Sequence, residues 1–182
     1  MNADLRADVI ARAGEIKLLL MDCDGVLTDG RLYFSENGEA LKVFHVRDGQ
    51  GLVMWHEAGF RSGIISGRDA EKILERRVKE LGMHYLKTCS SDKIKDLTEI
   101  LKDAKIGFDE TAYIGDDIGD VCLLEKVGLP IAVADAATEV FPFAKYTTRL
   151  KGGGSAVREV TDLLLKAKKI TFEKSAHSHK KL

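Results

Sequence analysis

The sequence predicts an α/β protein in which helices cover both faces of a parallel sheet. Two observations indicate this class. Short apolar runs of strand length alternate along the chain with longer segments of helical periodicity. Several of these runs end abruptly in polar residues, as parallel strands do at the sheet edge where ligands bind. The 182 residues, of which 45% are hydrophobic, suit a single domain over residues 1–182 with a sizeable core.

The elements follow in order from the periodicity. An amphipathic helix is expected over 1–17, with acidic residues that argue against a signal peptide. A buried strand follows over 16–22, and two β-prone stretches around a Glu-Asn-Gly turn make residues 25–45 a hairpin flap. Further strands are expected over 61–67, 84–87, 111–116 and 130–134, and further helices over 48–59, 69–82, 90–107, 120–128 and 155–170. The polar, basic residues 170–182 are expected to form a flexible tail.

The bulk properties exclude several classes of partner. The formal net charge is -1, without a long basic block before the tail, so nucleic acid is not expected as a partner. No apolar stretch approaches the ~20 residues of a membrane span, so no membrane association is expected. Cys23, Cys89 and Cys122 are odd in number and scattered, which predicts reduced, core-packed thiols and a cytoplasmic protein.

Two clusters of carboxylates follow two of the apolar strands. Asp22 and Asp24 end the first strand, and Asp116 and Asp117 end a later one, with Asp120 one helical turn further on. Because strand ends of a parallel sheet share one edge, these side chains are expected to converge. Each could instead be a helix cap or a turn residue, but two such clusters favour a shared site. Oxygen ligands without nearby His or Cys predict a hard divalent cation, most plausibly Mg²⁺.

Two further features indicate phosphoryl transfer. Ser66 and Gly67 end another strand and could hold phosphate through a hydroxyl and backbone N–H groups. Lys93 lies at the start of a predicted helix, where a cation opposes the helix dipole unless an anion binds beside it. Neither a GxxxxGK[ST] loop nor a GxSxG elbow is present in the sequence. The candidate nucleophile is therefore a carboxylate.

The stretches "DCDGV", "IISGR" and "GDDIGD", together with Lys93, resemble in order the four motifs of the haloacid dehalogenase (HAD) superfamily of aspartyl phosphatases. Longer stretches, including "DGVLTDG", "NGEALKVFHVRDGQG" and "GGGSAVREVTDLLL", resemble the family of 3-deoxy-D-manno-octulosonate 8-phosphate (KDO8P) phosphatases. That resemblance implies a Rossmann-like HAD fold without a large cap domain. It also implies a homotetramer, in which hairpins associate and a neighbour helps to close each site, and a place in lipopolysaccharide precursor synthesis.

The resemblance also implies roles for the carboxylates. Asp22 would attack phosphorus and form an aspartyl-phosphate, and Asp24 would protonate the leaving group and then activate water. Asp22, the backbone carbonyl of Asp24, and Asp116 would hold Mg²⁺. Asp117 or Asp120 would contact the metal ligands without binding the metal directly, and the sequence does not decide between these two residues.

The substrate would be a small sugar-acid phosphate. By the same resemblance, Ser66, Gly67 and Lys93 would bind the phosphoryl group, and Arg68 and Arg47 would bind the sugar acid. A related branch of the family acts on nonulosonate 9-phosphates, which stay open as the alternative substrates. The family often has Gly-Gly-Arg-Gly where this chain has Gly-Gly-Gly-Ser at 152–155.

Two other classes of function are less consistent with these residues. A non-catalytic oligomerisation domain could dispense with the nucleophile or with Lys93, and both are present. A receiver domain also uses clustered Asp residues, a Lys and Mg²⁺, but it lacks the pair formed here by Asp22 and Asp24. The sequence therefore favours a phosphoric monoester hydrolase.

Overall fold

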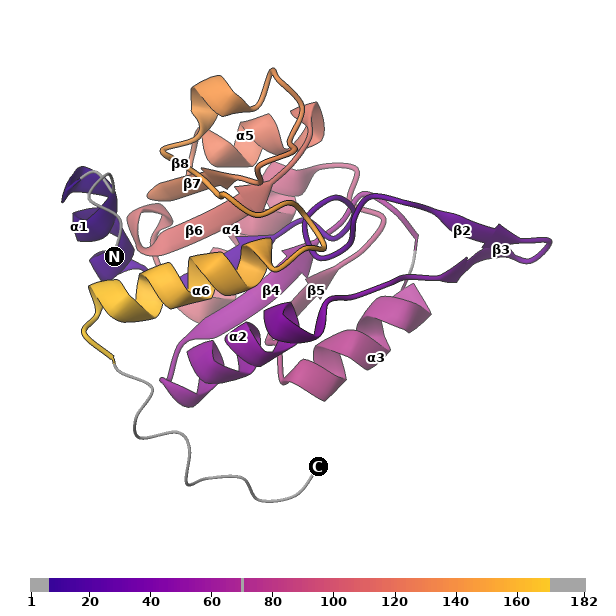
Figure 1. Ribbon diagram of the computed structural model, residues 1–182, viewed down its shortest axis with the longest axis horizontal. Coiled ribbons are helices and arrows are strands. Elements are labelled where there is room, and N and C mark those ends of the chain that lie inside the picture. Colours follow the sequence, from indigo (N-terminus) through magenta and orange to yellow (C-terminus); the bar gives the residue numbers. More distant parts are fainter. Residues whose placement is uncertain (1–6, 70, 171–182) are drawn as a thin grey trace.

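The computed structural model describes residues 7–69 and 71–170, which form a six-stranded parallel sheet with helices packed against it (Figure 1). The strand order is β5-β4-β1-β6-β7-β8, and every neighbouring pair runs parallel. The strands are β1 (Leu18–Met21), β4 (Arg61–Ile65), β5 (Tyr85–Lys87), β6 (Thr111–Gly115), β7 (Leu129–Ala132) and β8 (Tyr146–Thr147). The predicted α/β class is confirmed. The short edge strand β8 was not predicted, because two residues carry no periodicity.

Helices pack on both faces of this sheet (Figure 1). One face is covered by α1 (Ala7–Glu15), α2 (Val46–Glu57), α3 (Glu71–Leu81) and α6 (Ala156–Ala167). The other face is covered by α4 (Lys93–Ala104) and α5 (Val121–Leu124). Three single turns of 3₁₀ helix join these elements: η1 (Phe108–Glu110), η2 (Ile118–Asp120) and η3 (Phe141–Phe143).

The central strand β1 divides the core into two layers. Leu19 and Met21 pack among α1, α2, α3 and α6, whereas Leu18 and Leu20 pack among α4 and α5. All four side chains are fully buried, as the alternation of a two-sided strand requires. The continuous apolar run before Asp22 is therefore a strand covered on both sides, and its carboxyl end carries the first polar group.

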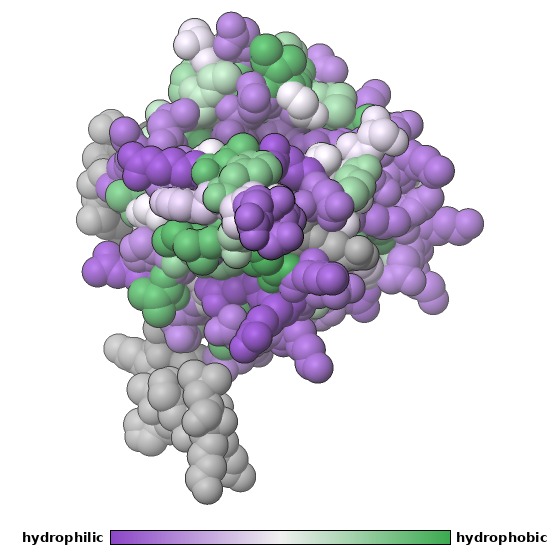
Figure 2. Space-filling model, turned by 90° about the vertical axis from the view of Figure 1, so that its right-hand side faces the viewer, coloured by the Kyte–Doolittle hydropathy of each residue, from purple (hydrophilic) through white to green (hydrophobic). Residues whose placement is uncertain are grey.

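A two-stranded hairpin, β2 (Tyr33–Ser35) and β3 (Gly38–Leu41), projects from the sheet after β1 (Figure 1). Gly38 has a φ of +103° at its turn, which glycine adopts without steric cost. Within the described residues this hairpin is the only insertion between β1 and α2, so a large cap domain is absent there, as predicted. Large apolar side chains are exposed on and around the hairpin: Leu32, Tyr33, Phe34, Leu41, Val43 and Val46. Figure 2 looks onto this end of the molecule and shows apolar surface beside hydrophilic surface.

Some expectations need correction. The helices expected at 48–59 and 120–128 are Val46–Glu57 and Val121–Leu124, because His45 caps the first and a 3₁₀ turn precedes the second. Cys23 is buried, but Cys89 and Cys122 are exposed, so core packing was wrong for two of the three cysteines. The tail expected over 170–182 lies outside the described residues, apart from Ile170. Residues 1–6 of the helix expected over 1–17 also lie outside them. Among the described helices, none has the length and apolar character needed to span a membrane.

Candidate active site

The carboxyl ends of β1, β4 and β6 open onto a cavity of about 820 Å³. The register places Met21 beside Ile64 and Ile114, so the three strands end at one level and their following loops meet. The residues singled out from the sequence that line this cavity are Asp22, Asp24, Ser66, Gly67, Arg68, Lys93, Asp116, Asp117 and Asp120. Arg47 is the exception, because it is exposed on α2 and does not line the cavity.

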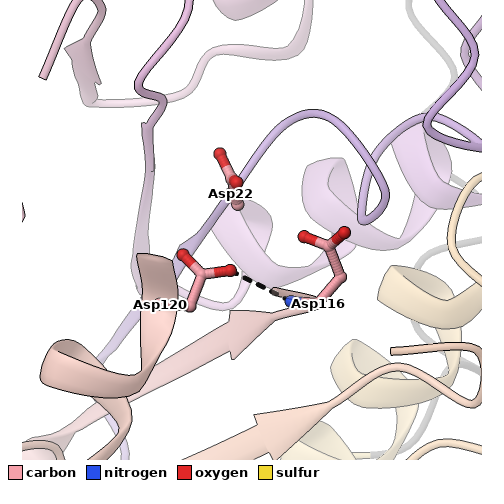
Figure 3. A group of neighbouring side chains, drawn as sticks. All are labelled: Asp22, Asp116 and Asp120. Carbon is pink, nitrogen blue, oxygen red and sulfur yellow. Dashed lines mark hydrogen bonds between the residues drawn. The ribbon is translucent and has the colours of Figure 1, made fainter. Parts of the chain in front are cut away.

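Three carboxylates gather at the floor of the cavity. Asp22, Asp116 and Asp120 each place a carboxylate oxygen within 4.8 Å of the other two (Figure 3). Asp120 is buried, and its Oδ2 accepts the backbone N–H of Asp116 at 3.0 Å. Asp116 Oδ1 is buried and accepts no hydrogen bond from any described residue. This oxygen is therefore available to a ligand.

The electrostatics of the cluster favour a bound cation. Burial and the nearby charge of Asp120 raise the pKa of Asp22 to about 6 and the pKa of Asp116 to about 8. Both shifts arise because several negative charges are held together away from water. A divalent cation would remove that cost, and an all-oxygen donor set suits Mg²⁺. The residues present therefore fit the predicted metal.

Lys93 supplies the positive charge that faces this cluster. Its Nζ atom lies 2.7 Å from Asp120 Oδ1 and 3.3 Å from Asp22 Oδ2. Burial opposes the charged form, but the carboxylates of Asp120 and Asp22 outweigh burial and raise the pKa of Lys93 above its ordinary value. Asp92 caps α4 by accepting the backbone N–H of Lys95, so Lys93 is the first residue of the helix and points back into the site.

Asp117 and Asp120, which the sequence left as equal candidates, differ in the structure. Asp117 is exposed, and its Oδ1 accepts the backbone N–H of Ile118 at 2.8 Å as the cap of η2. Asp120 instead touches Lys93 and receives the hydroxyl hydrogen bond of Tyr113 at 2.7 Å. The geometry therefore favours Asp120 as the residue that supports the cluster.

Backbone packing around glycines fixes the loop after β1. Gly25 has a φ of +86°, and a Cβ atom there would lie 2.0 Å from Asp116 Oδ2. Gly152, from the loop before α6, would place a Cβ atom 1.7 Å from the carbonyl oxygen of Gly25. The next residue, Gly153, donates its backbone N–H to the carbonyl of Val26 at 2.9 Å. The two loops therefore meet backbone to backbone, which only glycine permits.

The loop after β4 presents a compact turn to the cavity. The buried Ser66 holds this turn through its Oγ, which accepts the backbone N–H of Arg68 at 3.3 Å, and through its carbonyl, which accepts the N–H of Ser90 at 3.0 Å. A Cβ atom on Gly67 would meet only ordinary contacts, so its backbone is accessible. The Ser66 hydroxyl and the Gly67 backbone therefore line the same cavity as the carboxylates.

Sequence reasoning missed three residues of the site. Tyr113 is buried and donates its hydroxyl hydrogen bond to Asp120. Lys42 lies beside Asp24 at the base of the hairpin, and Glu39, on β3 near the hairpin turn, pairs with Lys42. Tyr113 sits in an apolar strand, where an aromatic residue carries no functional signal. Lys42 contacts a residue 18 positions away, so no local pattern could reveal the pair.

The chain is similar to known phosphatases in both sequence and structure. Residues 79–159 match a family model described as haloacid dehalogenase-like hydrolase. The 3-deoxy-D-manno-octulosonate 8-phosphate phosphatase KdsC of Escherichia coli (strain K12) is 47% identical over 161 residues, covering 88% of this chain and 85% of that protein. The crystal structure of the phosphatase of the same name from Yersinia pestis has a TM-score of 0.89 and 44% identity, covering 91% of this chain and 89% of that one.

A further solved structure carries ligands. The KDO8P phosphatase from Moraxella catarrhalis, in complex with magnesium ion, phosphate ion and KDO, has a TM-score of 0.87 and 35% identity, covering 91% of this chain and 94% of that one. The fold and the cavity are those of a hydrolase of the haloacid dehalogenase-like class. Within that class, the chain belongs to the family of KDO8P phosphatases.

Proposed function

We propose that this protein is a Mg²⁺-dependent phosphatase that hydrolyses KDO8P to 3-deoxy-D-manno-octulosonate and phosphate. The observation that carries the proposal is the position of Asp22. Its carboxylate lies in the cavity, 3.3 Å from the ammonium group of Lys93 and within 4.8 Å of a carboxylate oxygen of Asp116 and of Asp120. A carboxylate so placed can be held ionised and aimed at phosphorus once a cation and a phosphoryl group are bound.

Asp22 and Asp116 are the proposed metal ligands, together with the backbone carbonyl of Asp24. Asp120 supports them, because it accepts the N–H of Asp116 and anchors Lys93. Mg²⁺ bound there would neutralise charge on the phosphoryl oxygens. Asp117 contributes through the turn that it caps.

The reaction divides into two steps on Asp22. In the first, an Asp22 oxygen attacks phosphorus, the bond to the sugar oxygen breaks, and Asp24 gives its proton to the departing alkoxide. In the second, Asp24 takes a proton from water, which attacks the phosphorus of the aspartyl-phosphate and releases inorganic phosphate and free Asp22. Lys93, Ser66 and the backbone of Gly67 hold the phosphoryl oxygens throughout.

Arg68 is the proposed partner of the sugar-acid carboxylate. It lines the cavity, and 41% of its side chain is exposed, so a bidentate ion pair is sterically open. Arg47 was expected to bind substrate as well, but it lies outside the cavity of its own chain. A nonulosonate 9-phosphate carries the same carboxylate and is the alternative substrate.

The assembly is proposed to be a homotetramer in the cytoplasm that serves lipopolysaccharide precursor synthesis. The apolar side chains exposed on the hairpin support an association through this element, because isolated two-stranded hairpins are marginal in water. The exposed Cys89 and Cys122 form no disulfide with any described residue, in keeping with a reducing compartment.

The test is phosphate release from KDO8P, N-acetylneuraminate 9-phosphate and p-nitrophenyl phosphate, with Mg²⁺ and with a chelator. The proposal predicts Mg²⁺-dependent release with a strong preference for KDO8P, and no turnover by Asp22→Asn. Preference for the nine-carbon acid would overturn the substrate assignment. Turnover that survives the chelator or the Asp22→Asn change would overturn the chemistry.

A further inference from the structure

A lysine that takes no part in the proposed chemistry is buried beside Asp24. Lys42 follows β3 at the base of the hairpin, and only 1% of its side chain is exposed. Its Nζ atom lies 2.5 Å from Asp24 Oδ1 and 2.7 Å from Glu39 Oε1. Asp24 lines the cavity, whereas Lys42 and Glu39 do not. The lysine can therefore affect a reaction there only through the carboxylates that it contacts: Asp24 directly, and Glu39 by way of Arg68.

The burial of this pair makes its geometry rigid. A buried ammonium group is costly unless carboxylates compensate for its lost hydration, and Lys42 has two of them. Burial alone would lower the pKa of Lys42, but the contacts with Asp24 and Glu39 outweigh it and raise the pKa above its ordinary value. Lys42 is thus a fixed positive charge whose ammonium group contacts both Glu39 and Asp24.

The second oxygen of each carboxylate faces Arg68. Asp24 Oδ2 lies 3.7 Å from the Nε atom of Arg68, and Glu39 Oε2 lies 3.7 Å from one of its terminal nitrogens. Neither oxygen accepts a hydrogen bond from any residue that the structure describes. Asp24 therefore has one oxygen tied to Lys42 and one left free near the cavity-lining Arg68.

We propose that Lys42 and Glu39 are positioning residues that fix the carboxyl group of Asp24 for proton transfer to the leaving group. The inference rests on the proposed function, which gives Asp24 this proton transfer. It assigns the hairpin a second task besides association, because both positioning residues come from it. Misplacement of a reacting group by about 1 Å can cost on the order of 100-fold in rate, so the pair has a measurable effect.

The leaving group distinguishes this role from a general structural one. A sugar alkoxide is a strong base and leaves with a proton from Asp24, whereas p-nitrophenolate is a weak base and leaves without one. The ratio kcat/KM reports steps up to the cleavage of the ester bond and omits the later hydrolysis of the aspartyl-phosphate. A misplaced Asp24 therefore lowers kcat/KM for the sugar phosphate far more than for the aryl phosphate.

The experiment compares Lys42→Met with the wild-type protein, using p-nitrophenyl phosphate and the sugar-acid phosphate that the wild type hydrolyses best. We expect kcat/KM to fall about 10- to 100-fold for the sugar phosphate and less than about threefold for the aryl phosphate. The matched control is Lys17→Met, which removes a lysine that pairs with Glu110 at the opposite end of β1. It should leave both values unchanged.

Two further variants keep the test decisive if Lys42→Met folds poorly. Glu39→Gln retains the contact of Lys42 with Asp24 and should show a smaller loss with the same preference between esters. In an Asp24→Asn background, Lys42→Met should cause no additional loss for the sugar phosphate, because its effect passes through Asp24.

Several outcomes would overturn the inference. Equal losses for both esters would show a general disturbance of the site, and an unchanged or faster reaction would show that Lys42 does not help Asp24. Additive losses in the Asp24→Asn background would show that Lys42 acts by another route. A wild-type protein that hydrolyses neither ester would refute the proposed function itself, and this inference with it.

Discussion

Replacement of Asp120 by Asn tests the metal cluster most sharply. Asp120 accepts four contacts: Oδ1 meets the ammonium of Lys93 and the hydroxyl of Tyr113, each at 2.7 Å, and Oδ2 meets the N–H of Asp116 at 3.0 Å and of Asp117 at 3.4 Å. Asn has one oxygen and one NH₂ group. Its NH₂ group would therefore face either the donors of Lys93 and Tyr113 or the N–H donors of Asp116 and Asp117, and that pairing would be lost. The lost pairing costs about 1–3 kcal/mol at a buried site and leaves Asp116 less well oriented.

Loss of an orienting partner typically weakens metal binding about 10- to 100-fold, or roughly 1.4–2.7 kcal/mol. Isothermal titration of the metal-free protein with Mg²⁺ measures this directly, and the Mg²⁺ dependence of p-nitrophenyl phosphate hydrolysis gives a second value. Asp117→Asn is the matched control. Its exposed oxygen caps η2, a task that Asn performs equally well, so the change should be less than about threefold. If Asp117→Asn weakened Mg²⁺ binding more than Asp120→Asn, the assignment of the supporting carboxylate would be wrong.

Three other predictions concern pH, assembly and packing. The pKa values of Asp22 and Asp116 are raised in the folded protein, so without metal the folded state binds more protons than the unfolded state between pH 3.8 and about 8. The stability of the metal-free protein should therefore fall as pH rises through this range. Mg²⁺ displaces those protons, so it should raise Tm more at pH 8 than at pH 5.5; an equal rise would count against the cluster. Phe34→Asp, on the hairpin, should reduce the molar mass measured by light scattering, whereas Ile10→Asp on α1 should not; both side chains are exposed. Gly152→Ala should lower the free energy of unfolding by at least about 1–3 kcal/mol, because its Cβ atom would collide with the carbonyl of Gly25. The control, Gly14→Ala, meets no atom closer than 3.9 Å and should not destabilise the protein. Equal melting curves for the two variants would contradict this packing.

The sequence predicted those parts of the fold that depend on local periodicity. The apolar run before Asp22 and the turn before Gly38 each carry their own signal, so the central strand and the hairpin were expected at nearly the right positions. The start of α2 was wrong by two residues. The helix was expected from Asp48, a residue type that often caps helices, but Asp48 lies inside α2 and its Oδ1 accepts the backbone N–H of Arg158 near the start of α6. A contact over 110 residues leaves no trace in a local pattern.

The same limit applies to the candidate site. Asp22 and Asp116 could be placed together from the rule that parallel strands end at one edge, and Lys93 was added by its place at the start of a helix and by the family resemblance. The choice between Asp117 and Asp120 could not, since it depends on which side chain η2 turns inward. Lys42 also stayed hidden, because an isolated lysine after a β-prone stretch is usually at the surface.

The central claim is that the phosphoryl group of the substrate is transferred to Asp22, which forms a covalent aspartyl-phosphate before water releases phosphate. The most direct test is to quench the wild-type protein during turnover of KDO8P with Mg²⁺, reduce it with borohydride, and map the modified peptide by mass spectrometry. Borohydride converts an aspartyl-phosphate into homoserine. The account predicts homoserine at position 22, dependent on substrate. Homoserine at another carboxylate, or its absence while phosphate is being released, would contradict it.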